Sequence, residues 1–386
     1  MQKKFIRPMV ILLIIQFLVM VGFGIVIPIL PFFVGKLGGG ALSLGIFMSV
    51  YSIMQFIFAP IWGGLSDRIG RRPVLLIGLG GYGVTFLMFG MVNNLYLLIG
   101  LRALAGMVSS ATIPTAMAYL ADITEGADRS KGMGMLGAAM GLGMVFGPAI
   151  GGWLGLHSFS LPFFVAGGIA LLLLPFTWTF LPESLKRPIS DIPGRRRPRL
   201  TLEVMKDPLF ALFAFNFVIS FSMSMFESTF VLFSADKFGF GTEEMGITFA
   251  ILGIFAVIVQ GGLIGPLVKK FGESKLVNSG ALLSALGLIL IIFSGNAILL
   301  VMSTVVFMVG NSLMTPTSSS LVTKQNSRGQ GASLGFFQSF ASLGRVFGPV
   351  TGGALFEIGK GLPYIAGATF LVLIVLVAGS KLGAKT

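Results

Sequence analysis

Three charged side chains stand inside long apolar stretches of this chain, where they could carry chemistry. Glu227 lies in the run 226–230, and Arg102 and Arg345 lie in two other stretches. An ionised side chain at the centre of a membrane helix costs at least ~2.5–3.5 kcal/mol on insertion scales, which makes such residues functional candidates. Because burial favours the uncharged carboxyl group, we expect Glu227 to bind a proton, a cationic substrate, or each in turn. The alternatives are that Glu227 is permanently paired with a basic residue, or that it lies nearer the external surface of the membrane.

The two arginines keep their charge at physiological pH and so cannot act by titration. Arg102 would perturb a proton site or hold polar backbone groups. Arg345 would be the standing partner of Glu227 or contact an anionic part of a substrate. A nearby cation favours the carboxylate form, so a pair with Arg345 would oppose the effect of burial on Glu227.

Uncharged polar side chains in the same stretches are candidates either for a cavity lining or for hydrogen bonds between helices. They include Gln16, Gln55, Asn216, Asn311 and Gln338.

Phe226 and Phe230 flank Glu227 in the sequence. With the methionines nearby they would form an adaptable apolar wall, or else face lipid.

The composition restricts the class of protein. Of 386 residues 55% are hydrophobic and 11% charged, against ~25% charged in a soluble domain. A soluble enzyme, a disordered protein and a nucleic-acid-binding module are therefore poor fits. The chain has no cysteine and a single histidine, His157, so we expect no metal site, no thiol chemistry and no catalytic triad. No G-x-x-x-x-G-K-S/T segment is present, which disfavours transport driven by ATP.

Continuous apolar runs of membrane-spanning length recur along the chain and favour helices over an alternating β-barrel. We predict an all-α polytopic membrane protein with 12 transmembrane helices in two pseudo-symmetric six-helix halves. The expected spans are 9–34, 44–65, 73–92, 95–121, 131–156, 161–181, 208–235, 244–269, 275–294, 297–323, 330–357 and 362–381.

The net charge of +13 agrees with this topology if both termini are cytoplasmic, because most basic residues then fall inside. The charge is accordingly read as a topology signal and not as a nucleic-acid site. The predicted domains are a first bundle at 1–182, a cytoplasmic linker at 183–207 and a second bundle at 208–386. The linker is basic and proline-rich, and is either simply solvated or drawn to anionic lipid.

The two halves repeat. The segment 143–152 matches 344–353 at an offset of 201, and 63–70 aligns with 265–272 at an offset of 202. Parallel repeats of this kind place a substrate site near the midplane between two bundles, as alternating access requires.

The segment 63–72, with the sequence GGLSDRIGRR, falls between two spans on the expected cytoplasmic side. Gly63 and Gly70 would permit a close helix contact and a sharp turn. Asp67 would accept hydrogen bonds from a neighbouring helix N-terminus, whose partial positive charge favours an anion. The other interpretation is an ordinary charged turn that fixes topology. The second copy has Lys269 in place of the acid, so topology alone does not require Asp67.

Basic side chains complete this candidate gating segment: Arg68, Arg71 and Arg72. We expect Arg71 and Arg72 to pair with Asp122 or Glu125, at the cytoplasmic end of the fourth span.

A glycine pattern marks the fifth span. Gly143, Gly147 and Gly151 recur every four residues and would let one helix face pack closely on a neighbour. Gly152 directly follows Gly151, and Pro148 removes a helix hydrogen bond and would kink or hinge the span. Plain helix packing and a gating seam that resists leakage both require this arrangement.

These segments resemble the major facilitator superfamily over essentially the whole chain. Segment 63–72 is similar to its cytoplasmic loop signature, and 143–152 is similar to the fifth-helix G-x-x-x-G-P-x-x-G-G signature of proton-coupled drug antiporters. Segment 98–106 resembles the fourth-helix motif with its intramembrane arginine, here Arg102, and 22–31 resembles the first-helix signature of the twelve-helix branch. The second half departs from this pattern by carrying its own glycine-proline copy.

The resemblance implies a proton-coupled secondary transporter, similar to bacterial multidrug and tetracycline exporters, which exports small lipophilic or cationic compounds by alternating access. We expect a proton gradient as energy source with no cofactor, a small-molecule substrate, protons and membrane lipids as partners, and no nucleic acid. We expect a monomer in the inner or plasma membrane, and no enzyme activity. The rivals are a narrow-specificity metabolite or sugar transporter, a lipid flippase of the same fold, a membrane sensor and an intramembrane hydrolase.

Overall fold

The computed structural model describes residues 3–124, 126–185, 209–324 and 330–379, in which all regular structure is helical. Most of the expected linker, with Arg195, Arg196 and Arg197, lies outside these ranges, as does Glu125.

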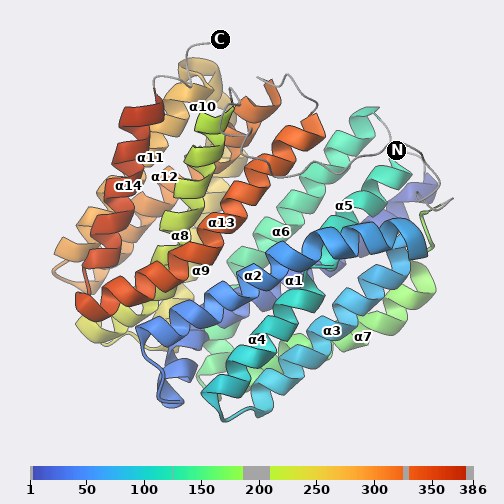
Figure 1. The fold of residues 1–386 in the computed structure, drawn as a ribbon, viewed down its shortest axis with the longest axis horizontal. Helices are drawn as coiled ribbons and strands as arrows, with labels where there is room; N and C mark the ends of the chain where they lie inside the picture. The colour runs from blue at the N-terminus through green and yellow to red at the C-terminus, as the bar shows by residue number, and fades with distance from the viewer. Residues whose placement is uncertain (1–2, 125, 186–208, 325–329, 380–386) are drawn as a thin grey trace. The chain divides into compact units, whose positions relative to one another are not determined.

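The first half of the sequence forms seven helices (Figure 1): α1 Lys3–Lys36, α2 Ala41–Ile69, α3 Arg71–Met91, α4 Leu95–Ser109, α5 Thr112–Ile123, α6 Gly126–Gly155 and α7 Leu161–Phe180. The second half begins with α8 Phe210–Phe238 and α9 Thr242–Ile258. A π-helical segment, η3 Val259–Leu263, joins α9 to α10 Ile264–Phe271. The half continues through α11 Glu273–Phe293, α12 Ala297–Lys324, α13 Gln330–Ile358 and α14 Leu362–Ala378.

Within the described residues, every predicted span coincides with helical structure, so the all-α polytopic membrane fold is confirmed. In the described ranges ten helical segments are long and apolar enough to cross a membrane, and α14 is a shorter apolar helix. Two spans are composite. The helices α4 and α5 together make the span Leu95–Ile123, and α9, η3 and α10 make Thr242–Phe271.

The interruptions in these spans differ from the continuous helices that we predicted. Between α4 and α5 the helix stops at Ser110 and Ala111, just before Pro114. Proline clashes with the carbonyl group four residues earlier, which disfavours a continuous helix at this point. In α9–α10 the π-helical segment contains Gly261 and Gly262, two residues with low helix propensity. The corresponding stretch of α2, 202 residues earlier, contains Pro60 inside the helix.

The internal repeat holds residue by residue in several elements. Both α3 and α11 have 21 residues, and each end of α11 lies 202 positions after the matching end of α3. At the starts of α4 and α12, Asn94 and Asn296 are likewise 202 residues apart. The side chain of Asn94 accepts hydrogen bonds from the backbone N–H groups of residues 96 and 97, and that of Asn296 accepts one from residue 299. Such caps satisfy amide groups that the helix leaves unpaired.

The chain divides into two compact units. The first consists of Met1–Gly38, Val50–Arg195 and Gly241–Ala250, and the second of Gly39–Ser49, Arg196–Phe240 and Ile251–Thr386. Each unit has its own aromatic core. In the first, Phe86, Phe89 and Phe163 pack with ring centroids 5.7–6.1 Å apart. In the second, Phe226 lies 4.6 Å from both Phe230 and Phe307.

Candidate functional site

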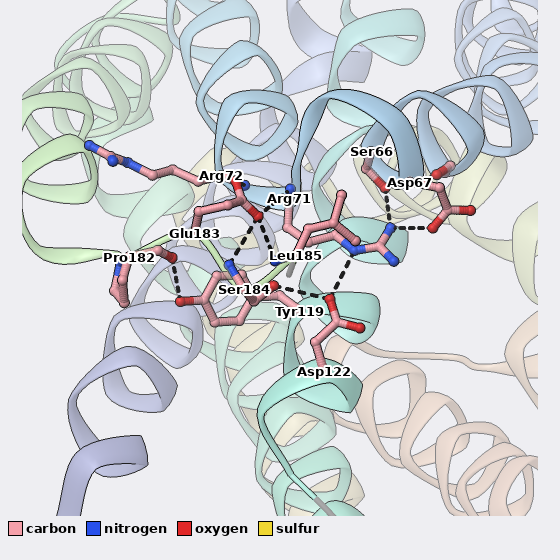
Figure 2. A network of polar contacts seen from close by, with 11 residues as sticks. Ser66, Asp67, Arg71, Arg72, Tyr119, Asp122, Pro182, Glu183, Ser184 and Leu185 are labelled. Atoms are coloured by element: carbon pink, nitrogen blue, oxygen red, sulfur yellow. Dashed lines mark hydrogen bonds and ion pairs between the residues drawn. The ribbon is translucent and has the colours of Figure 1, made fainter. Parts of the chain in front are cut away.

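The polar network at the junction of α2 and α3 centres on Arg71, a buried arginine in the first unit (Figure 2). Its Nη1 lies 2.7 Å from Oδ1 of Asp67 and donates to the hydroxyl of Ser66 at 2.6 Å. Its Nε donates to Oδ2 of Asp122 at 3.1 Å. One guanidinium group therefore ties the end of α2 to the end of α5. The predicted contact of Arg71 with Asp122 is present.

A carboxylate distant in sequence closes the network from the other side. Glu183, just after α7, accepts hydrogen bonds from the backbone N–H of Arg71 at 2.8 Å and of Arg72 at 3.1 Å. These are the first two residues of α3, whose N–H groups have no partner within the helix. An anion is favoured there by the helix dipole. Glu183 therefore caps α3 from 112 residues away. The sequence predicts that Asp67 is the anion at a helix N-terminus. Glu183 has this role instead, and Asp67 pairs with Arg71.

Gly70 makes this cap possible. It has φ +109° and ψ 158°, a conformation that is essentially restricted to glycine. A Cβ atom built on Gly70 would collide with Oε2 of Glu183. The sharp turn that we predicted at Gly70 is thus also a place where a carboxylate approaches the backbone.

Two further contacts hold the chain after α7 in place. The hydroxyl of Tyr119 donates to the carbonyl oxygen of Pro182 at 2.6 Å, and that of Ser184 donates to Oδ2 of Asp122 at 3.0 Å. The Glu183 carboxylate also accepts from the backbone N–H of Ser184 and Leu185 (Figure 2). Our sequence analysis did not single out these residues. The signal available was an acid directly after a proline at the end of a span.

Arg72 behaves differently from our expectation. We predicted a pair with Asp122 or Glu125, of which only Asp122 is described. Instead its guanidinium group lies 4.6 Å from the ring centroid of Trp178 and donates to the carbonyl oxygen of that residue. Arg71 already occupies Asp122, and the aromatic ring offers Arg72 a favourable cation–π contact.

Two other members of the predicted gating segment are less engaged. Arg68 is exposed. Gly63 makes no close helix contact in the described part of the chain, because nothing lies within 4 Å of a Cβ built on it, which corrects that prediction. Its carbonyl oxygen accepts the hydroxyl of Ser66 at 2.8 Å.

In the second unit, Glu227 occupies the interior of α8, seventeen residues after Phe210 and eleven before Phe238. Arg345 lies near the middle of α13, and its Nη2 donates to the hydroxyl of Ser342 at 3.1 Å. Glu227 and Arg345 are the two charged side chains that we considered as a standing pair. Among the described residues they form no ion pair within 4 Å, so the standing pair that we considered is absent as a direct contact.

The candidates near Glu227 separate into packed and open positions. Phe226 and Phe230 are almost fully buried and stack on each other, so they belong to the core of the unit. Asn216 is also buried and donates to the carbonyl oxygen of residue 337 at 2.7 Å, which joins α8 to α13. In contrast, Asn311 is partly exposed and Gln338 is exposed.

In the first unit, Arg102 is buried with its guanidinium carbon 4.1 Å from the ring centroid of Tyr51. The Tyr51 hydroxyl forms a hydrogen bond with Ser109 at 2.9 Å and accepts one from Gln55 at 3.1 Å. The structure therefore places Arg102 and Gln55 in one polar cluster around Tyr51. Tyr51 is the member of that cluster that our sequence analysis missed.

Gln16 lies on α1 and is fully buried. Its side-chain amide donates to the carbonyl oxygen of Thr112 at 3.3 Å, which is a hydrogen bond between helices.

The glycine pattern of α6 packs directly on α1. A Cβ on Gly143 or Gly147 would lie 2.5 Å from the carbonyl oxygen of Phe17 or Val21, respectively. Gly151 meets the carbonyl oxygen of residue 25 in the same way. Four-residue steps on α6 thus match four-residue steps on α1, so the glycines bring two backbones together.

The neighbouring motif positions also pack closely. Pro148 lies against Gly24 of α1, and Gly152 against Gly246 of α9. The second unit repeats the arrangement between α13 and α8, where Gly344 and Gly348 approach the carbonyl oxygens of Phe217 and Phe221.

The described residues contain no group of three or more histidine, cysteine or acidic side chains that could hold a metal ion.

Residues 12–264 and 261–382 match the family model of the Major Facilitator Superfamily. The chain belongs to this superfamily of transporters, as the helical repeat and the network at the α2–α3 junction lead one to expect.

Among its relatives, "Multidrug resistance protein 1" of Bacillus subtilis (strain 168) is 32% identical over 383 residues, covering 99% of this chain and 98% of that protein. "Multidrug resistance protein 2" of the same organism is 30% identical over 366 residues, covering 92% and 90%. "Quinolone resistance protein NorA" of Staphylococcus aureus (strain COL) is 27% identical, covering 95% and 94%. The predicted resemblance to the multidrug branch is therefore confirmed.

Solved structures agree on the fold. A POT family transporter in complex with a thioalcohol-conjugated peptide has a TM-score of 0.80 at 15% identity, covering 98% of this chain and 97% of that chain. The nucleoside transporter NupG has a TM-score of 0.79 at 16% identity, covering 98% and 100%. The human organic anion transporter MFSD10 has a TM-score of 0.70 at 22% identity, covering 96% and 98%.

Proposed function

We propose that this transporter exports small lipophilic or cationic compounds in exchange for protons, by alternating access between two six-helix bundles at 1–182 and 208–386. Its relatives named for multidrug and quinolone resistance support the substrate class. We further propose that it is a monomer in the cell membrane with both termini cytoplasmic, that the proton gradient drives it without a cofactor, and that it is not an enzyme.

The observation that carries the proposal is the position of Glu227. It is partly buried in the interior of a membrane span, and in the described chain it has neither a hydrogen bond nor an ion pair. A carboxyl group held by no fixed partner can exchange a proton for a cationic substrate.

The network around Arg71 would provide a cytoplasmic lock. Its contacts join the ends of α2, α3, α5 and α7 within the first bundle, and a state of the transporter that shifts these ends against one another would break them. Contacts that exist in only one of two states favour that state, so they set the populations from which a substrate shifts the equilibrium.

The test is flux in proteoliposomes under an imposed pH gradient. Glu227→Gln should insert into the membrane normally but lose gradient-driven accumulation of a lipophilic cation, because an amide cannot titrate. Glu243→Gln is the matched control, since Glu243 is an exposed acid in the first turn of α9. Unchanged accumulation in Glu227→Gln would refute the coupling role.

The same assay separates the rivals. A panel that includes sugars, nucleosides and fluorescent phospholipids would show a narrow-specificity transporter or a flippase as flux of a single class. Binding without flux would indicate a sensor.

A further inference from the structure

The beginning of α2 packs against α13, apart from the rest of its own helix. Residues 39–49 belong to the second compact unit, whereas the remainder of α2 belongs to the first. A Cβ atom on Gly353 of α13 would collide with the carbonyl oxygen of Ala41. In the same way, a Cβ atom on Gly45 of α2 would collide with the carbonyl oxygen of Pro349. Glycines on both helices therefore bring the two backbones together along this stretch.

Hydrogen bonds join the two helices at both ends of the packed stretch. Oε1 of Glu357, in the last turn of α13, accepts the backbone N–H of Leu42 at 3.0 Å. A Cβ atom on Gly40 would lie 3.1 Å from the same oxygen, so the carboxylate lies directly against the start of α2. About two turns further along α2, the hydroxyl of Ser49 donates to the carbonyl oxygen of Val346 at 2.6 Å. Each helix thus contributes one side chain that fastens the start of α2 to α13.

Helix α2 takes an acceptor from a neighbour because its own first turn contains no acid. The first N–H groups of a helix have no partner within it, and the helix dipole favours an anion there. The first turn of α9, in contrast, contains two acids. One of them, Glu244, accepts the backbone N–H of Gly241 at 2.8 Å. The repeat offset of 202 takes Glu244 back to Leu42, the residue that Glu357 caps.

The reciprocal pair of helices, α6 and α9, packs without such a bridge. Residues 241–250, which begin α9, belong to the first compact unit, and Gly152 of α6 packs on them at Gly246. The offset of 201 that relates α6 to α13 takes Glu357 back to Leu156, which has no carboxylate to offer. Of these two helix starts, that of α9 is therefore capped from within, and that of α2 is capped by its neighbour.

We infer that Glu357 is a positioning residue for transport, which latches the start of α2 to the end of α13 in one state of the cycle and releases it in the other. With both termini cytoplasmic, these two helix ends lie at the external side, where an exported compound leaves. Glu357 acts on transport through α2. This inference rests on the proposed function, because a latch matters only in a protein that alternates between states.

The strength of the contact suits a latch that opens in every cycle. Glu357 is exposed, and an exposed carboxylate at a helix N-terminus shifts a two-state equilibrium ~2–5-fold. A contact of this size biases the two states without fixing either of them. Its loss should therefore change the populations of the states while the protein remains folded.

The buried side chain of Ser49 provides the reporter position. The chain has no natural cysteine, so Ser49→Cys introduces a single thiol at the α2–α13 contact, where Ser49 is 2% exposed. A water-soluble maleimide reaches this thiol when α2 moves away from α13. In the full chain in lipid nanodiscs, Glu357→Gln should speed labelling ~2–5-fold, because the charge that favours the latched state is lost. Glu244→Gln is the matched control, since it removes the same charge from the internal cap of α9, and it should label at the parent rate.

A further variant separates a latch from a plain helix cap. Leu42→Glu gives α2 an acid of its own, at the position that Glu244 holds in α9. Combined with Glu357→Gln, it should restore the melting temperature but leave labelling fast, because the new acid does not hold α2 to α13. If Glu357 only stabilised the start of α2, this double variant would label at the parent rate.

Export driven by a proton gradient in proteoliposomes is the second readout. Glu357→Gln should slow export ~2–5-fold, in line with the shifted populations, and Glu244→Gln should export at the parent rate. The latch would be overturned by unchanged labelling in Glu357→Gln, by unchanged export of that variant beside an active parent, or by a return to the parent labelling rate when Leu42→Glu is added. Absence of export in the parent, together with the expected labelling changes, would refute only the proposed function.

Discussion

Replacing Gly70 by alanine tests how much the cap from Glu183 contributes, because the same turn exists twice. An alanine with φ +109° and ψ 158° costs ~1–3 kcal/mol of backbone strain. Its Cβ would also displace the Glu183 carboxylate from the first N–H groups of α3. Loss of a helix cap costs ~0.5–2 kcal/mol, so Gly70→Ala should lower the free energy of unfolding by ~1.5–5 kcal/mol in total.

Gly272→Ala is the matched control. Gly272 has φ +79° and ψ 157°, and nothing lies within 4 Å of a Cβ built on it. This variant should be destabilised only by the backbone strain of the alanine, ~1–3 kcal/mol. The difference between the two variants, about 1 kcal/mol, is the contribution of the displaced cap.

The assay is the free energy of unfolding in mixed micelles titrated with a denaturing detergent. Gly70→Ala should be measured alone and together with Glu183→Ala. Once the cap is absent, the alanine at residue 70 should cost no more than the alanine at residue 272. An equal loss in the two glycine variants, or an effect of Gly70→Ala that persists undiminished beside Glu183→Ala, would refute this account.

Two further predictions concern helix packing and the cytoplasmic lock. Gly147→Ala should destabilise the chain by ~1–3 kcal/mol through overpacking against α1, measured by detergent-induced unfolding. Gly141→Ala, on an open face of α6, should be neutral or stabilise it by up to ~1 kcal/mol, and equal effects would contradict the packing. Asp67→Asn should slow transport severalfold with substrate binding retained, because its ion pair with Arg71 at 2.7 Å is lost, and parental flux would argue against the lock.

Hydropathy and the repeat were enough to predict the helical fold. A span in the bilayer must hydrogen-bond its own backbone groups, which favours a helix, and it is recognisable in the sequence as one apolar run. Interruptions within spans were harder to foresee. Pro114 ends α4 early, whereas Pro316, 202 residues later, lies inside the continuous helix α12. The same residue type at equivalent positions has two outcomes, so the surrounding packing decides between them.

Individual side-chain partners were predicted only in part. The contact of Arg71 with Asp122 followed from their positions at neighbouring span ends. The cap by Glu183 did not, because the carboxylate lies 112 residues from the helix that it caps and at the start of the segment that we predicted to be a linker. The ion pair of Glu273 with Lys324 could have been predicted from the repeat. The offset of 202 takes Arg71 to Glu273 and Asp122 to Lys324, with both charges reversed.

The paired interruptions in α2 and in α9–α10 affect the stiffness of the molecule. Pro60 donates no backbone hydrogen bond in α2, and the π-helical segment η3 replaces the usual ladder at the corresponding place in the second half. Long helices bend most easily at such points, since no regular hydrogen bond has to be broken there. Each half thus contains a compliant joint about two turns before a charged residue, Asp67 in one half and Lys269 in the other. The short helical segment beyond each joint can tilt as a lever while the rest of its helix stays packed.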